Sequence, residues 1–136
     1  MDKRIEFTWP VRVYYEDTDA GGVVYHSNYL NFMERARTEW LRALGFEQTD
    51  LKDSLGIVIV VHSLSIVFKS PAYFNDLLAV HCDIAKIGKS SIEIAQKITS
   101  DAKTLVNAHV KVAFVRADTF KPVGIPEQIK QAMLAQ

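Results

Sequence analysis

Cysteine is nearly absent from this chain of 136 residues, which contains only Cys82. A single cysteine excludes an intramolecular disulfide framework and suits a reducing compartment. Long apolar runs are also missing, since no stretch approaches the roughly 20 residues that cross a bilayer. The N-terminal segment carries charge and lacks the apolar core of a signal peptide. We therefore expect a cytoplasmic protein without a membrane span.

The chain also has no net charge of either sign. The 16 basic and 16 acidic residues cancel, so nothing predicts a broad surface for nucleic acid or membrane lipid. Internal repeats, low-complexity tracts and linkers rich in glycine, proline or serine are not found. A chain of this length is long enough for one hydrophobic core and too short for two. We predict a single domain over residues 1–136.

The strongest pattern present is an amphipathic helix that begins near Asn28 and stops before Gly45. Ser27 or Asn28 suits its N-cap, and Gly45 suits the left-handed residue that follows a helix. Arg37 falls within the apolar face, so its guanidinium needs a partner, and Glu34 is the nearest candidate in the helix. The apolar side chains occupy an arc of about 140°; they are Leu30, Met33, Ala36, Trp40, Leu41 and Leu44.

Strands are predicted on both sides of this helix, because apolar and polar residues alternate there or β-branched residues dominate. Short turns join the later strands, and strands joined in this way pair antiparallel. The helix then has only that sheet to pack against. We predict an α+β fold, a curved antiparallel sheet wrapped around one long helix, whose exposed edge strands favour self-association. The strands are expected at 5–15, 57–69, 80–85, 92–95 and 106–114, with a short helix after Pro126.

Acidic residues and two glycines gather at 16–22, EDTDAGG, between the first predicted strand and the helix. As a calcium loop, this segment would need a bidentate Glu where Asn28 stands. As an aspartyl-phosphate loop, it would need alternating strand and helix units, which the chain lacks. A plain acidic turn, whose carboxylates accept backbone N–H groups, stays open as an interpretation.

The two glycines and the helix that follows them favour catalysis over a plain turn. Gly21 and Gly22 let the backbone approach a ligand closely, and N–H groups at a helix start bind developing negative charge. A carboxylate beside such donors suits acyl transfer or hydrolysis. Other candidates are weaker. Cys82 alternates with polar positions in a strand and is expected to be an inert core thiol, and the scattered histidines lack the spacing of a metal site.

The chain closely resembles the acyl-CoA thioesterases of the hotdog superfamily, most clearly at 11–41, VRVYYEDTDAGGVVYHSNYLNFMERARTEWL. The likeness is to the hydroxybenzoyl-CoA thioesterase family, specifically its Tol-Pal-associated bacterial members, and it extends over nearly the whole chain. The resemblance implies a hotdog fold, with the long helix at the centre of the sheet. It also implies a homodimer or homotetramer with active sites at the dimer interface. The implied substrate is acyl-CoA, hydrolysed without metal or cofactor beyond the CoA of the substrate itself.

The resemblance also implies roles for particular residues. The family pattern Asp-x-x-Gly, two apolar residues and Tyr-His places its aspartate on Asp19, which would act as general base or nucleophile on the thioester. The backbone N–H near His26 would hold the thioester carbonyl oxygen, and Tyr15 and His26 match further active-site positions. In relatives a turn between two later strands contacts the phosphates of coenzyme A, which points to Lys89 and Ser90.

Two alternatives for the function stay open. The same chemistry would act on acyl groups carried by acyl carrier protein. A non-catalytic module that binds acyl thioesters, tied to the cell envelope or to phospholipid synthesis, would need no ionisable group at the helix start, so Asp19, Tyr15 and His26 favour the enzyme. Asp17 is expected to order the loop as a hydrogen-bond acceptor.

Overall fold

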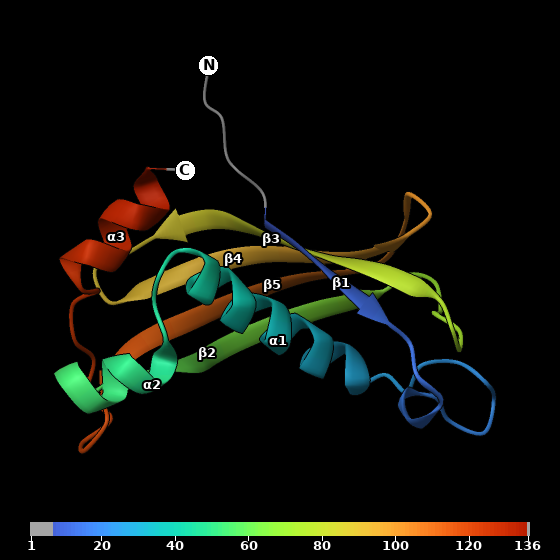
Figure 1. The fold of residues 1–136 in the computed structure, drawn as a ribbon, viewed down its shortest axis with the longest axis horizontal. Coiled ribbons are helices and arrows are strands. Elements are labelled where there is room, and N and C mark those ends of the chain that lie inside the picture. The colour runs from blue at the N-terminus through green and yellow to red at the C-terminus, as the bar shows by residue number, and fades with distance from the viewer. Residues whose placement is uncertain (1–6, 136) are drawn as a thin grey trace.

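The computed structural model describes residues 7–135, which form a five-stranded antiparallel sheet crossed by one long helix (Figure 1). The strand order is β1-β3-β4-β5-β2, so β1 and β2 are the edge strands. This arrangement confirms the predicted α+β architecture. The strands are β1 Phe7–Arg12, β2 Ile57–Phe68, β3 Leu77–Ile87, β4 Ser91–Ser100 and β5 Lys103–Arg116.

Strand β1 is shorter than the strand predicted at 5–15. The first two residues of that prediction lie outside the described residues. The strand ends at Arg12 because Tyr15–Asp17 close into a 3₁₀ turn, η1. Pro10 lies in this edge strand, as expected for a residue that has no N–H to donate to a central ladder. The strand predicted at 57–69 is confirmed up to Phe68, where β2 ends, and its pairing with β5 shifts register between Val61 and Ser63.

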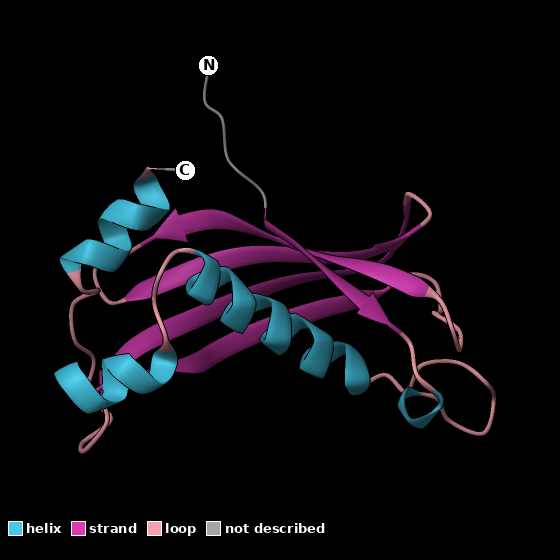
Figure 2. Cartoon of the chain, viewed as in Figure 1, coloured by secondary structure: helices cyan, strands magenta, loops and turns pink. Residues whose placement is uncertain are grey.

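Helix α1 spans Asn28–Ala43 and lies across one face of the twisted sheet, as Figure 2 shows. Gly45 follows it with a φ of 100°, which is the predicted left-handed position. The predicted cap is wrong for the Ser27 side chain, which makes no capping hydrogen bond. Ser27 has helical backbone angles, whereas a capping residue is usually extended. Among the residues that the structure describes, no Ser27 side chain therefore caps the N–H groups at the start of α1.

The buried face of α1 is rotated relative to the predicted one. Tyr29 and Phe32 are 3% and 1% exposed, whereas Leu30 is 37% exposed. The helix lies close to β3 and β1, and its Met33 and Arg37 contact Gln96 on the central strand β4. The side chains that α1 buries are Tyr29, Phe32, Met33, Ala36, Trp40 and Leu41.

Arg37 does not pair with Glu34 as predicted. Its Nη1 donates to Oε1 of Gln96 at 2.9 Å, and Gln96 is itself only 2% exposed. Nε2 of Gln96 donates to the backbone oxygen of Met33 at 3.1 Å, while Glu34 accepts a hydrogen bond from Thr38. Burial lowers the pKa of Arg37, although nearby negative charge acts in the opposite direction.

Three short helical segments complete the described part of the chain. α2, Gln48–Asp50, continues into a π-helical turn, η2, Leu51–Leu55. α3, Glu127–Leu134, begins after Pro126 as predicted and lies at the end of the sheet that is far from the loop following β1 (Figure 1). No helix within residues 7–135 is long and apolar enough to cross a membrane.

Candidate active site

A tight hairpin between β1 and α1 carries Asp19 at its tip. The Asp19 N–H donates to the backbone oxygen of Val23 at 3.0 Å, and the Gly22 N–H donates to the backbone oxygen of Asp19 at 3.0 Å. Gly22 has a φ of 80°, a backbone conformation that an L side chain would strain. The hairpin therefore needs a glycine at this position to close, and it leaves Asp19 exposed.

The Asp19 carboxylate is held by its own turn through one oxygen. Oδ1 accepts the Gly21 N–H at 2.8 Å, and a Cβ added at Gly21 would come within 3.3 Å of that oxygen. Gly21 therefore suits this position because a larger residue would crowd the Asp19 carboxylate. Within the described residues, the other oxygen, Oδ2, has no hydrogen-bond partner. This oxygen is available to accept a proton or to attack a substrate.

Asp17 is tied into the structure through both carboxylate oxygens. Oδ2 accepts the Tyr14 N–H at 2.8 Å, and Oδ1 accepts from the side-chain amide of Asn28 at 3.0 Å. Asn28 is the first residue of α1, so Asp17 joins the loop to the helix start. These are the contacts of a residue that orders the loop, the role predicted for Asp17.

The start of α1 presents unpaired N–H groups next to this hairpin. The Tyr25 N–H donates to the backbone oxygen of Asp17, and the Asn28 N–H donates to that of Tyr25. Among residues 7–135, the backbone N–H groups of His26 and Ser27 have no acceptor. The partial positive charge of a helix N-terminus adds to these donors. An oxyanion placed here would receive hydrogen bonds from both.

An open hollow of about 280 Å³ lies beside these donors and is lined by Val24, His26, Tyr29, Phe68, Lys69, Ser70 and Pro71. The Tyr29 hydroxyl accepts the Ala72 N–H at 3.0 Å, which fastens the segment after β2 to the start of the helix. Burial raises the pKa of Tyr29, so this hydroxyl stays protonated at neutral pH. The rings of His26 and Phe68 meet edge to face, with centroids 6.3 Å apart.

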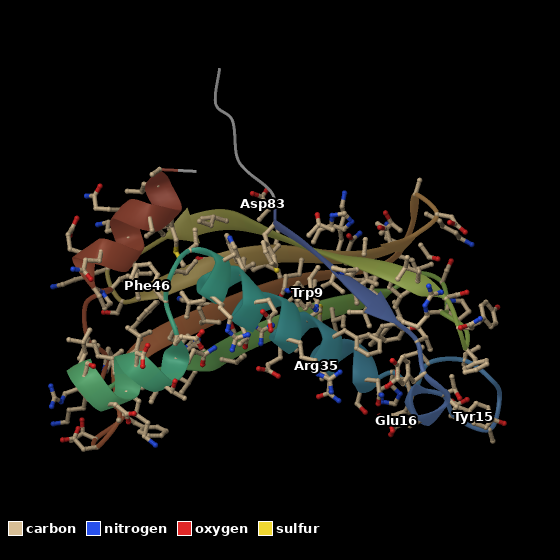
Figure 3. The ribbon with its side chains drawn as sticks, viewed as in Figure 1. Trp9, Tyr15, Glu16, Arg35, Phe46 and Asp83 are labelled. Atoms are coloured by element: carbon tan, nitrogen blue, oxygen red, sulfur yellow. The ribbon has the colours of Figure 1, made fainter. Side chains whose placement is uncertain are left out.

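Tyr15 lies on the same loop and is not among the residues that line the hollow. It is 78% exposed and packs edge to face against Phe74, with ring centroids 5.3 Å apart. Figure 3 shows Tyr15 at the end of the molecule opposite Phe46, which follows α1 at its far end. Within the described part of the chain, no hydrogen bond joins the side chains of Tyr15, Asp19 and His26. The three residues therefore lie in the same segment between β1 and α1 without a hydrogen bond between their described side chains.

Lys89 and Ser90 lie in the β3–β4 turn, at the other end of the sheet (Figure 1). The Asp19 loop adjoins the first residue of β3, since Arg12 pairs with Leu77. From there to Ile87 the strand advances by about 33 Å. The Lys89 side chain therefore cannot reach the Asp19 loop of its own chain.

Sequence reasoning missed Tyr29 and Phe68 as parts of the site. Tyr29 is three residues after His26, and residues at that spacing lie on one face of a helix, so a search for neighbours of His26 could have found it. Phe68 carries no such signal, because its proximity to His26 depends on how β2 is placed under the helix. In the described residues, no group of His, Cys, Asp and Glu is placed to hold a metal ion.

An antiparallel sheet is wrapped around one long helix, and a carboxylate turn leads into N–H groups at the helix start that have no acceptor within residues 7–135. This combination is typical of the hotdog-fold thioesterases. Residues 13–133 match the family model of the thioesterase-like superfamily, and the chain belongs to that family. The predicted family and the predicted hotdog fold are thereby confirmed.

Individual relatives agree with this assignment. The chain is 45% identical to the acyl-CoA thioesterase YbgC of Haemophilus influenzae over 126 residues, which are 93% of each chain. It is 43% identical to the acyl-CoA thioester hydrolase YbgC of Escherichia coli O157:H7 over 124 residues, 90% of this chain and 92% of the relative. The crystal structure of a probable thioesterase from Bartonella henselae matches with a TM-score of 0.86 and 34% identity, covering 90% of this chain and all of that one (100%).

Proposed function

We propose that this protein hydrolyses acyl-CoA thioesters to free CoA and a carboxylic acid. The observation that carries the proposal is the Asp19 carboxylate, with Oδ2 unpaired among the described residues, on a hairpin that leads directly into the unpaired N–H groups of His26 and Ser27. A base or nucleophile next to oxyanion donors is what thioester cleavage requires. The names of the relatives from Haemophilus influenzae and Escherichia coli support the same activity.

Asp19 can act by two routes. As a general base, it takes a proton from water while the water oxygen attacks the thioester carbon; the C–S bond then breaks, and the CoA thiolate takes that proton. As a nucleophile, Oδ2 attacks the carbon itself, CoA leaves as the thiolate, and water cleaves the resulting anhydride. In both routes the N–H groups of His26 and Ser27 stabilise the oxyanion. A single turnover in ¹⁸O-water separates the routes, because label found in Asp19 requires the anhydride.

A second copy of the chain would complete the substrate site. β2 is an edge strand, and its inner-face side chains Val61, Leu64 and Phe68 are 50%, 39% and 47% exposed. An unpaired edge beside exposed apolar side chains favours pairing with another strand. We expect two copies to pair antiparallel through β2. A two-fold axis near the middle of β2 brings the β3–β4 turn of one copy to the end of the sheet where the other copy has its Asp19 loop.

That pairing keeps the predicted role of Lys89 and Ser90. In the dimer, these residues of one copy would contact the phosphates of a CoA whose thioester lies at the Asp19 of the other copy. Lysine suits this contact because its ammonium group is a compact point charge. The contact holds the nucleotide end of the substrate and takes no part in the bond changes.

The direct test of the proposed function is release of free thiol from a panel of acyl-CoAs that differ in chain length. We expect release well above the rate in buffer for at least part of the panel, without added metal. A folded protein that releases no thiol from any member would refute the proposal and would favour a module that only binds acyl thioesters.

A further inference from the structure

The β3–β4 turn, which carries Lys89 and Ser90, is held by parts of the chain that lie outside its own hairpin. The backbone oxygen of Lys89 accepts the Ile125 N–H at 2.9 Å, and that of Ser90 accepts the Phe114 N–H at 2.8 Å. Phe114 belongs to β5, whereas Ile125 lies in the segment between β5 and α3. The tip of a hairpin is usually among the more mobile parts of a fold. Here the backbone of both tip residues is fixed by later parts of the chain.

The segment 121–126, which supplies the Ile125 N–H, is itself fixed to the sheet. The Val123 N–H donates to the backbone oxygen of Phe114 at 2.9 Å, and the Val123 side chain packs against the core. Ile125 is 8% exposed and belongs to that core. The donor that reaches Lys89 therefore comes from a segment that is both hydrogen-bonded and packed.

Helix α3 holds the far end of this segment. The helix begins directly after Pro126 and buries Ile129 and Met133. Ile129 is 0% exposed and Met133 is 8% exposed, and both belong to the core cluster. Figure 1 shows α3, in red, beside the end of the sheet where β3 turns into β4. The packing of α3 therefore fixes the position of the segment and, through the Ile125 N–H, that of the turn.

We propose that α3 and the segment 121–126 position the β3–β4 turn for the phosphates of coenzyme A, a proposal that rests on the proposed function. Lys89 is exposed and its side chain is flexible, so the backbone of the turn sets the region that its ammonium group can reach. A backbone that is already ordered loses less entropy on binding. Ile129 is then a positioning residue, because it is buried and acts on the phosphates only through Ile125 and Lys89. The bond changes take place at Asp19 of the other copy, so loosening the turn weakens binding of the nucleotide and leaves the chemical step unchanged.

Ile129→Ala tests this assignment, because it removes a buried contact of α3 and leaves every residue of the turn in place. We expect KM to rise by about 3- to 10-fold, the range that ordering one long side chain is worth, for the acyl-CoA that the wild type hydrolyses best. The value of kcat should stay the same. The same acyl group on N-acetylcysteamine, a thioester without the nucleotide, should keep its KM.

Ile98→Ala is the matched control. Ile98 is also 0% exposed, but it lies near the end of β4 that is far from the turn. The same atoms are therefore removed from the core without loosening α3. We expect the ratio of KM for the acyl-CoA to KM for the N-acetylcysteamine thioester to stay at its wild-type value.

A double-mutant cycle with Lys89→Ala separates positioning from general damage. If Ile129 acts through Lys89, adding Ile129→Ala to Lys89→Ala should raise KM for the acyl-CoA much less than it does in the wild-type background, because the two changes act on one contact. The same fold-change in both backgrounds would overturn the proposal.

An unchanged KM for the acyl-CoA in folded Ile129→Ala would also overturn the proposal, as would an equal rise for the N-acetylcysteamine thioester. If circular dichroism shows that Ile129→Ala does not fold, Met133→Ala replaces it, with the same expected rise in KM and the same contrary results. The proposed function fails separately, since in that case the wild-type protein releases no thiol from any acyl-CoA.

Discussion

Replacing Asp19 by Asn keeps the shape of the side chain and removes its basic oxygen. The amide oxygen that Asp19→Asn introduces can still accept the Gly21 N–H, which the Asp19 carboxylate accepts at 2.8 Å, so the hairpin should close as before. The oxygen that is lost is Oδ2, which has no partner within the described residues. We therefore expect little change in stability and a fall in kcat of at least about 100-fold, the lower range for general-base catalysis, or about 2.7 kcal/mol of transition-state stabilisation.

Asp17→Asn is the matched control, two residues away on the same loop. Both oxygens of Asp17 accept hydrogen bonds, from the Tyr14 N–H and from the Asn28 side chain, and an amide would turn one acceptor into a donor. Losing one hydrogen bond to a charged group costs about 1.5–3 kcal/mol, so Tm should fall by several degrees. The remaining activity should follow the fraction of protein that is folded.

The assay for both variants is thiol release from acyl-CoA under saturating substrate, with thermal unfolding followed by circular dichroism on the same preparations. A folded Asp19→Asn protein with the kcat of the wild type would refute the assigned chemistry. The division of roles would also be wrong if Asp17→Asn lost as much activity as Asp19→Asn at unchanged Tm.

Four further outcomes are expected. Lys89→Ala should raise KM for acyl-CoA by up to about 10-fold at unchanged kcat, as loss of uniform binding does, whereas short thioesters without the nucleotide should not respond; an equal effect on both would indicate structural damage. Light scattering at micromolar concentration should give at least a dimer, and a monomer would remove the shared site. Gln96→Leu should destabilise the fold by about 1–3 kcal/mol in denaturant unfolding, because Arg37 loses its acceptor; unchanged stability would contradict that contact. The hydrogen bond from His109 lowers the pKa of Glu93. The contribution of the Glu93 carboxylate to folding stability is therefore present above the ordinary carboxyl pKa of about 4.3 and is lost as pH falls through the lowered pKa. The Tm values of the wild type and Glu93→Gln should converge in acid and differ slightly at pH 7.

The sequence was enough to predict the elements with strong periodicity. α1, the strands and the antiparallel order of β3, β4 and β5 were predictable because burial on one face of a helix or sheet imposes a fixed spacing on apolar residues. The rotation of α1, which buries Tyr29 and exposes Leu30, was not, because it depends on the strands over which the helix packs. The local spacing of apolar residues does not indicate which strands the helix packs against.

Contacts between residues that are distant in the chain could not be predicted from the sequence either. Arg37 was predicted to pair with Glu34 in its own helix, and its actual partner is Gln96, 59 positions away. The Asp19 hairpin was predictable as a site because its glycines and its acid lie within one short segment. The distance of Lys89 from Asp19 became visible only once the direction of β3 was known, and it makes the predicted CoA contact dependent on a second copy.

We propose that the Asp19 end of this molecule breaks a thioester bond and does not merely bind one. Incubation of the wild-type protein with dodecanoyl-CoA, followed by quantification of both products, tests it most directly. We expect equal amounts of free CoA and dodecanoic acid, formed over many turnovers per active site. Tight binding of dodecanoyl-CoA that leaves the thioester intact would contradict it.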